Sequence, residues 1–162
     1  DGSHVIAVGD GFELTARADR IDILSDGSAA IYDYKTGKPP SEKWVTDLVA
    51  PQLPLEAAIL AKGGFKSLGA VTPSGLTYIY ISGRLEGGDQ QDVADSTKAK
   101  ALAENALENL TRLIAHFNNP DTPYEVKRRS SRAFESAYRY DPYEQLARVK
   151  EWGILSADED TP

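Results

Sequence analysis

Residues 31–37 constrain the fold of this chain most strongly, because a short run with apolar and aromatic side chains ends there in Gly37 and is followed by Lys38 and two prolines. Such a run before glycine and proline predicts a β-strand that leads into a loop. Side chains alternate between the two faces of a strand, so Asp33 and Lys35 point the same way. The pair is either a surface ion pair, which contributes little to stability, or part of a site that holds a cation and a phosphate.

A second carboxylate is expected beside this strand. Residues 5–24 have the alternation of strands, interrupted by a turn signal at residues 9–11, and the alternation changes phase at Asp19. The change of phase indicates a bulge, a bend, a new covering layer or a strand that is covered on both faces. Residues 25–28 predict a hairpin turn, and counting outward from that turn places Asp19 nearly opposite Asp33.

Two helices are predicted after this hairpin. Ser41 is a suitable N-cap for a short helix, and a second helix is expected from residue 50 to about residue 62. On the second helix Gln52 shares a stripe with Leu55 and Ile59, which must face the core. A polar amide on such a stripe needs a buried partner, so Gln52 is a candidate site residue.

The remaining elements are one strand, one loop and one long helix. Residues 76–82 have the strongest β propensity in the chain and predict a strand. Residues 87–92, rich in glycine and aspartate, predict a loop, and residues 95–118 predict an amphipathic helix that covers the core. A length of 162 residues fits one domain with its own core. The acidic residues 156–162 are expected to form a disordered tail.

Composition excludes several classes of site. The chain has no cysteine, which excludes disulfides, thiol nucleophiles, zinc–cysteine sites and iron–sulfur clusters. No apolar run is long enough to span a membrane, so no membrane partner is expected. The two Gly-Gly pairs do not fit a phosphate-binding loop. The chain lacks methionine even at position 1, and we therefore expect a fragment of a longer protein.

Charge gives a mixed signal about nucleic acid. The net charge is −7, whereas a free-standing nucleic-acid binder usually carries a basic surface. One dense basic cluster, followed by several tyrosines, is either a grip on a nucleic-acid backbone or a solvated loop. Its members are Lys127, Arg128, Arg129 and Arg132.

The candidate site residues suit hydrolysis of a phosphodiester. Two carboxylates on adjacent strands, Asp19 and Asp33, form an oxygen-rich site that favours Mg²⁺ or Mn²⁺. Such a cation lowers the pKa of a bound water and offsets charge on the phosphate. Lys35 can orient that water or bind the phosphate, and Gln52 can hold Lys35 in place.

In combination, three motifs resemble the RecB-type branch of the PD-(D/E)XK nucleases. That branch has a G-x-x-D-R-I-D strand, a D-Y-K-[ST]-G strand and a Q-L-x-L-Y helix. The matching residues here are Asp19-Arg20-Ile21-Asp22, Asp33-Tyr34-Lys35-Thr36-Gly37 and Gln52-Leu53-Pro54-Leu55. The resemblance extends from Phe12 to Trp152, and residues 143–152 are similar to the C-terminus of the B subunit (AddB) of AddAB-type ATP-dependent helicase–nucleases.

The resemblance implies an α/β (α+β) fold: a restriction-endonuclease-like core with a small mixed central β-sheet flanked by α-helices, in a single nuclease domain over residues 1–155. It implies a Mg²⁺- or Mn²⁺-dependent deoxyribonuclease, an exonuclease within the full machine. Asp19, Asp33 and the backbone carbonyl of Tyr34 are the implied metal ligands, Lys35 is the catalytic lysine and Gln52 is the glutamine of the helix. The implied partners are DNA, the rest of the B subunit and the helicase–nuclease A subunit. The implied setting is the bacterial cytoplasm at the nucleoid, in the resection of double-strand breaks for recombinational repair.

The chain departs from that pattern in places. Ala16 stands at the first glycine of the family, and Glu56 stands at its tyrosine. Glu56 is either an extra acidic group near the site or a surface-leaning carboxylate, and we favour the surface position. The family usually has an acidic or histidine ligand on a helix before the first strand, which this chain is expected to lack. The isolated fragment is then weakly active or inactive, and the alternative function is a catalytically inactive nuclease-fold module that binds DNA or a partner subunit.

Overall fold

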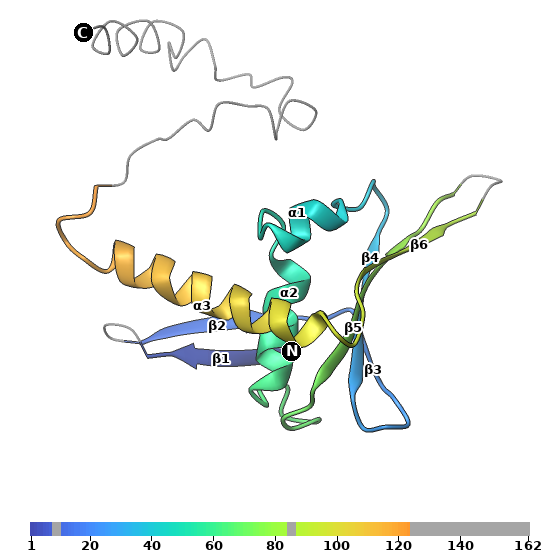
Figure 1. Cartoon of the computed structure of the whole chain (residues 1–162), viewed down its shortest axis with the longest axis horizontal. Helices are drawn as coiled ribbons and strands as arrows, with labels where there is room; N and C mark the ends of the chain where they lie inside the picture. The colour runs from blue at the N-terminus through green and yellow to red at the C-terminus, as the bar shows by residue number, and fades with distance from the viewer. Residues whose placement is uncertain (8–10, 84–86, 124–162) are drawn as a thin grey trace, which may run out of the picture. The chain divides into compact units, whose positions relative to one another are not determined.

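A computed structural model describes residues 1–7, 11–83 and 87–123 (Figure 1). The basic cluster at residues 127–132 and the acidic tail at residues 156–162 lie outside the described residues. The expected single domain over residues 1–155 therefore stays a prediction. The fold below is that of the unit Asp1–Pro123.

Along the described part of this unit, four strands are followed by two helices, two further strands and a third helix. They are β1 (Gly2–Ile6), β2 (Phe12–Ala16), β3 (Arg20–Ile23), β4 (Ala29–Lys35), α1 (Glu42–Thr46), α2 (Gln52–Ala61), β5 (Pro73–Tyr80), β6 (Asp89–Ala94) and α3 (Ala99–Phe117). Among the helices of the described ranges, none is long and apolar enough to cross a membrane.

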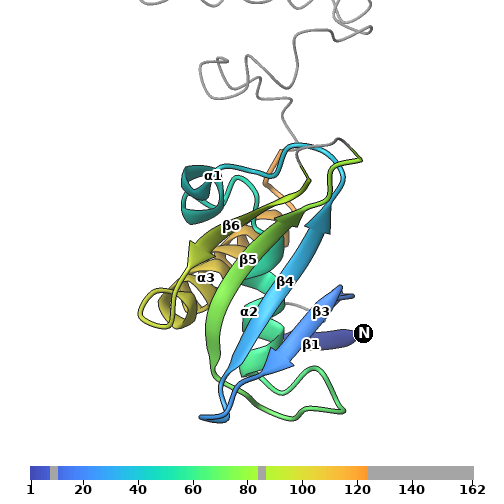
Figure 2. The same ribbon diagram turned by 90° about the vertical axis from the view of Figure 1, so that its right-hand side faces the viewer.

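A four-stranded mixed sheet forms the centre of the fold, in the order β3-β4-β5-β6. Strand β4 is antiparallel to β3 and parallel to β5, and β6 is antiparallel to β5. Strands β1 and β2 form a separate antiparallel pair. Figures 1 and 2 show α2 and α3 on one face of the four-stranded sheet. The structure thus confirms the predicted α/β class with a restriction-endonuclease-like core, and its described helices cover the sheet on one face.

The core lies between this sheet face and the two longer helices. Ile31 of β4 and Leu76 of β5 are fully buried, as expected for neighbouring strands in the middle of a sheet. Helix α2 is buried on most sides, and it packs against the apolar face of α3. The buried residues of the two helices include several alanines, whose small side chains allow close helix packing: Ala57, Ala58, Ala99, Ala103 and Ala106.

The change of phase at Asp19 marks a change of sheet. Strand β2 pairs with β1, whereas β3 pairs with β4, and the chain bends between Ala16 and Arg20. Of the readings that the sequence left open, the structure shows a bend, after which the chain pairs with a different strand. The bend places Asp19 immediately before β3 rather than within a continuous strand.

The loop predicted after residue 86 is wrong in part. Residues 87–92 were expected to form a loop, but Asp89–Ala94 form strand β6, paired with β5. Aspartate and glutamine have low β propensity, which explains why the sequence pattern missed this strand. It is an edge strand with mostly exposed polar side chains, and the Thr77 hydroxyl of β5 donates to the Asp92 carboxylate over 2.8 Å.

Helix ends follow local capping chemistry. The Ser41 side chain accepts a hydrogen bond from the Trp44 backbone N–H over 3.3 Å, which confirms the predicted N-cap. Helix α3 begins at Ala99, four residues later than predicted, because the Asp95 carboxylate forms a turn with the backbone N–H groups of Thr97 and Lys98.

Candidate active site

The candidate site lies at the C-terminal end of β4. Asp33 and Lys35 share the face of β4 that looks toward α2, as the alternation predicts. Asp33 is only 3% exposed, and its Oδ2 atom lies 2.7 Å from the Lys35 ammonium. This contact is an ion pair rather than a directed hydrogen bond, because Oδ2 has no partner with hydrogen-bond geometry among the described residues. The negative charge of this buried carboxylate is therefore compensated mainly by the Lys35 ammonium and by a hydrogen bond from Gln52.

Gln52, at the first position of α2, joins the two residues. Its side-chain Nε2 donates to Asp33 Oδ1 over 2.7 Å, and its Oε1 accepts from Lys35 Nζ over 3.0 Å. The buried partner that the amide was expected to need is therefore Asp33. The contact between Gln52 and Lys35 is also the one expected from the sequence, although the helix stripe alone did not specify its geometry.

Asp19 reaches the same end of the sheet from β3. The register pairs Arg20 with Tyr32, so one further step along the two strands sets Asp19 opposite Asp33. The Asp19 Oδ2 atom accepts the backbone N–H of Tyr34 over 3.0 Å. In an extended strand the N–H and C=O of one residue point to the same side, so the Tyr34 carbonyl leaves β4 on the side of Asp19.

Glu56 corrects the sequence analysis, because it is buried rather than surface-leaning: only 2% of the residue is exposed. It lies one helical turn after Gln52, and its Oε1 accepts from Gln52 Nε2 over 3.1 Å. Burial, with the charges of Asp33 and Asp19 adding to it, raises the pKa of Glu56 to about 7, against the opposing effects of Gln52 and Lys35. The shared stripe with Gln52 was the signal in the sequence, but a helix that is buried on most sides leaves few positions for surface residues.

Tyr78 is a site residue that the sequence analysis missed. It lies beside Asp33 in the parallel register of β4 and β5 and is only 1% exposed. The Lys35 ammonium stands 5.7 Å from the centre of its ring, within range of a cation–π contact. Burial, with Asp33 and then Glu56 adding to it, raises the pKa of the Tyr78 phenol to about 12, so it remains protonated at neutral pH.

Two other residues of the first motif point away from this cluster. The Arg20 guanidinium makes two hydrogen bonds to the Asp22 carboxylate, of 2.8 and 2.6 Å, and stands 5.1 Å from the ring centre of Tyr32. Arg20 is directly opposite Tyr32, and Tyr32 is on the face of β4 opposite to Asp33. Asp22 thus pairs with Arg20, and the structure does not bring it to Asp33.

The comparisons with known proteins agree with this geometry. A family model of the PD-(D/E)XK nuclease superfamily matches residues 2–133. The chain belongs to the PD-(D/E)XK nuclease superfamily.

Two relatives are uncharacterized proteins of Rickettsia. One, from Rickettsia typhi, is 35% identical over 103 residues, which cover 62% of this chain and 11% of that protein. The other, from Rickettsia conorii, is 38% identical over 58 residues, which cover 36% of this chain and 7% of that protein. The chain thus spans about a tenth of the length of the curated relatives that it matches. No solved structure matches the chain.

PD-(D/E)XK nucleases generally use divalent metal ions, and the donor atoms here fit such an ion. Asp33 and Asp19 offer hard carboxylate oxygens, and each oxygen that already accepts one contact keeps a second lone pair. Within the described part of the chain, no three His, Cys, Asp or Glu side chains form a metal-binding group. The remaining ligand positions would be taken by backbone carbonyls and waters, which suits Mg²⁺ because it keeps several waters.

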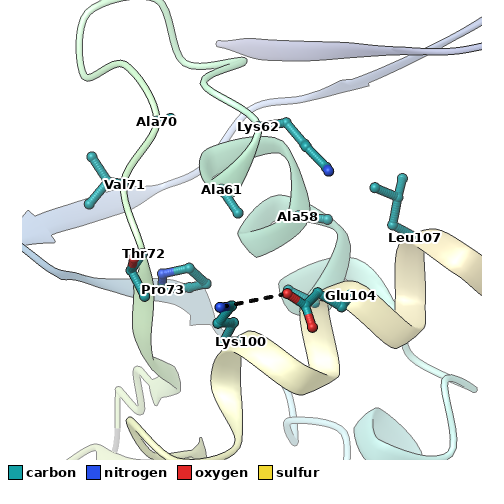
Figure 3. Close-up of a pocket in the computed structure, with 11 residues that line it drawn as sticks. Ala58, Ala61, Lys62, Ala70, Val71, Thr72, Pro73, Lys100, Glu104 and Leu107 are labelled. Atoms are coloured by element: carbon teal, nitrogen blue, oxygen red, sulfur yellow. Dashed lines mark ion pairs between the residues drawn. The ribbon is translucent and has the colours of Figure 1, made fainter.

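A cavity elsewhere in this PD-(D/E)XK domain is a poor candidate for catalysis. It has a volume of about 300 Å³ and lies between α2, α3 and the segment before β5 (Figure 3). Its walls are largely apolar, and its charged groups include Lys100 and Glu104, which face one another over 3.9 Å. None of Asp19, Asp33, Lys35 and Gln52 lines it. The chemistry of the side chains, not the volume of a hollow, therefore locates the candidate active site.

Proposed function

We propose that this domain is a metal-dependent deoxyribonuclease that hydrolyses phosphodiester bonds of DNA with Mg²⁺ or Mn²⁺. The observation that carries the proposal is the cluster at the end of β4. A nearly fully buried aspartate contacts both a lysine and a glutamine, and a second aspartate is held on the adjacent strand. A surface ion pair would not bury Asp33 to 3% exposure and would not need a glutamine from a helix.

Each residue has a distinct role in this proposal. Asp19, Asp33 and the Tyr34 carbonyl hold the cation, which when bound supplies an activated water and neutralises phosphate charge. The Lys35 ammonium has three N–H donors. Within the described residues, one of these donors faces Asp33 and another faces Gln52, so the third can serve the phosphate or the attacking water. Gln52 limits where Lys35 can go, which favours reaction because a positioned charge needs no reorganisation.

The wider setting is part of the same proposal. The resemblance of residues 143–152 to the C-terminus of AddB-type subunits supports a place in a helicase–nuclease machine that resects double-strand breaks for recombinational repair. DNA, the rest of the subunit and a helicase–nuclease A subunit are then the partners, in the bacterial cytoplasm. In that setting other domains supply DNA binding, which suits a chain of net charge −7.

Cleavage of end-labelled DNA by the whole protein tests the proposal. With Mg²⁺ or Mn²⁺ present, we expect Asp33→Ala and Lys35→Ala each to lower the rate by about 100-fold or more, since the first removes a proposed ligand of the cation and the second removes a charge that acts on the reacting phosphate. Glu104→Gln, an exposed change on α3, serves as the control. Cleavage at the wild-type rate by either site variant would overturn the assignment. DNA binding without cleavage by the wild type would support the inactive, binding-only module instead.

A further inference from the structure

We propose that Glu56 is a positioning residue for Lys35 and acts through Gln52. The inference rests on the proposed nuclease function for its catalytic consequence, and on the contacts alone for its structural part. Among the described residues, the Glu56 side chain accepts a hydrogen bond of 3.1 Å from the Gln52 side chain. Gln52 in turn contacts both Lys35 and Asp33.

The donors and acceptors allow one orientation of the Gln52 amide. An ionised carboxylate only accepts hydrogen bonds, a protonated carboxyl keeps an accepting oxygen, and an ammonium only donates. The two Nε2 protons of Gln52 face the carboxylates of Asp33 and Glu56, and its Oε1 faces the Lys35 ammonium. Turning the amide over would set its oxygen against two carboxylates and its N–H groups against a cation. Glu56 therefore helps to keep a carbonyl dipole aimed at Lys35.

Glu56 has a feature that Asp33 lacks. Asp33 is a proposed metal ligand, so the Lys35 ammonium, the Gln52 amide and the cation must share its two oxygens. Glu56 is not among the proposed metal ligands. If a bound cation drew Asp33 away from Gln52, Glu56 would remain as the acceptor that keeps Gln52 from rotating into solvent. That acceptor is needed, because Gln52 is an exposed residue at the beginning of α2, where water competes for its amide.

The burial of Glu56 argues for a role of this kind rather than for one in stability. Its Oε2 atom has no hydrogen-bond partner in the part of the chain that the structure describes. A buried carboxylate with an unsatisfied oxygen lowers stability compared with an apolar side chain of similar volume. A purely structural residue at this position would be leucine-like, so a glutamate here is explained by what it accepts from Gln52.

Steady-state cleavage and metal binding by the full chain test the proposal with two variants of one residue. Glu56→Leu removes the acceptor, whereas Glu56→Gln keeps a carbonyl oxygen at the same reach. For Glu56→Leu we expect kcat to fall by about tenfold or more, since a small misplacement of a catalytic group has effects of that size. We expect KM for DNA, and the Kd for Mn²⁺ measured by electron paramagnetic resonance, to change by less than about twofold. Glu56→Gln should recover most of the lost kcat.

A double variant separates positioning from other effects. If Glu56 acts only through Gln52, then Glu56→Leu slows cleavage no further once Gln52→Leu is present. A wild-type kcat for Glu56→Leu, an equal loss in Glu56→Gln, or a further loss in the double variant would each overturn the proposal. An unfolding curve for each variant identifies any that fails to fold, and Glu56→Gln then decides the question, because it keeps both the volume and the acceptor.

A readout without cleavage distinguishes failure of this inference from failure of the nuclease proposal. The side-chain N–H signals of Gln52 can be followed by NMR in the full chain. We expect the Gln52 amide proton that faces Glu56 to exchange slowly with solvent in the wild type and in Glu56→Gln. The same proton should exchange quickly in Glu56→Leu. If the wild type does not cleave DNA but shows this pattern, the nuclease proposal fails and the positioning contact stands. An unchanged exchange rate in Glu56→Leu would overturn the positioning contact itself.

Discussion

The raised pKa of Glu56 predicts an unusual dependence of stability on pH. The pKa of this carboxyl rises from its ordinary 4.5 to about 7 in the folded chain. Each unit of such a shift corresponds to about 1.4 kcal/mol, so the whole shift is worth about 3 kcal/mol. A raised pKa means that the folded chain holds this proton more tightly than the unfolded chain does. Glu56 therefore leaves the free energy of unfolding unchanged below pH 4.5, lowers it as pH rises toward 7, and has no further effect above that.

Replacing Glu56 by glutamine removes this titration and keeps the acceptor for Gln52. We expect the difference in the free energy of unfolding, variant minus wild type, to rise by about 3 kcal/mol between about pH 4 and about pH 8. Urea unfolding followed by circular dichroism, in the presence of a chelator so that no divalent cation binds, gives this difference at each pH. Other titrating groups contribute equally to the variant and to the wild type, so their contributions cancel in the difference in the free energy of unfolding.

Glu104→Gln is the matched control, because it removes a carboxylate that is largely exposed on α3 and lies 3.9 Å from Lys100. We expect its difference from the wild type to stay within about 0.5 kcal/mol over the same pH range. A flat difference for Glu56→Gln as well would refute the reasoning, since Glu56 would then titrate as it does in the unfolded chain.

Three further predictions concern the scaffold that carries the site. In a urea titration, Ile31→Ala should lower the free energy of unfolding by about 2–5 kcal/mol because it leaves a cavity beneath β4. The control Ile23→Ala changes a residue that is 50% exposed and should lower it by less than about 1 kcal/mol. Gly64→Ala should lower the free energy of unfolding by about 1–3 kcal/mol, because its added methyl would meet the Ser3 carbonyl and the Ile59 side chain. Gly37→Ala is the control, because its added methyl meets open space. Equal urea midpoints for the two variants would contradict the close packing around Gly64. Ser41→Ala should cost about 1 kcal/mol through loss of the N-cap of α1, as measured by thermal unfolding, and an unchanged midpoint would show that this cap contributes nothing.

Features set by neighbouring residues were predictable from the sequence. The turn at residues 25–28 fixes the register of β3 and β4, which is why counting outward from it placed Asp19 opposite Asp33. Alternation along one strand placed Asp33 and Lys35 on one face, and helical spacing placed Gln52 toward the sheet. In each case the relevant geometry lies within a single hairpin, strand or helix, over which backbone periodicity is reliable.

Features set by distant pairing were not predictable in the same way. Tyr78 reaches the site through the parallel register of β4 and β5, which no local pattern encodes. Strand β6 exists because β5 offers it a hydrogen-bonding edge, and its own residues favour a loop. Glu56 was placed on the surface because glutamate is rarely buried, and only the tight packing of α2 overrides that preference. The roles of the site residues remain proposals.

The central parallel pair of strands also sets when the site can exist during synthesis of the chain. The side chains proposed to hold the cation, act on the phosphate or position Lys35, from Asp19 to Glu56, are made before β5, which begins at Pro73 and carries Tyr78. Until β5 emerges, one edge of β4 lacks its hydrogen-bonding neighbour, so the strand that carries Asp33 and Lys35 is not yet held in place. At about 5–20 residues per second, the stretch from Glu56 to the end of β5 at Tyr80 takes about one to five seconds to synthesise. A ribosome-bound chain is therefore expected to carry all of these residues without an assembled site, and cleavage competence would arise only once the sheet is complete.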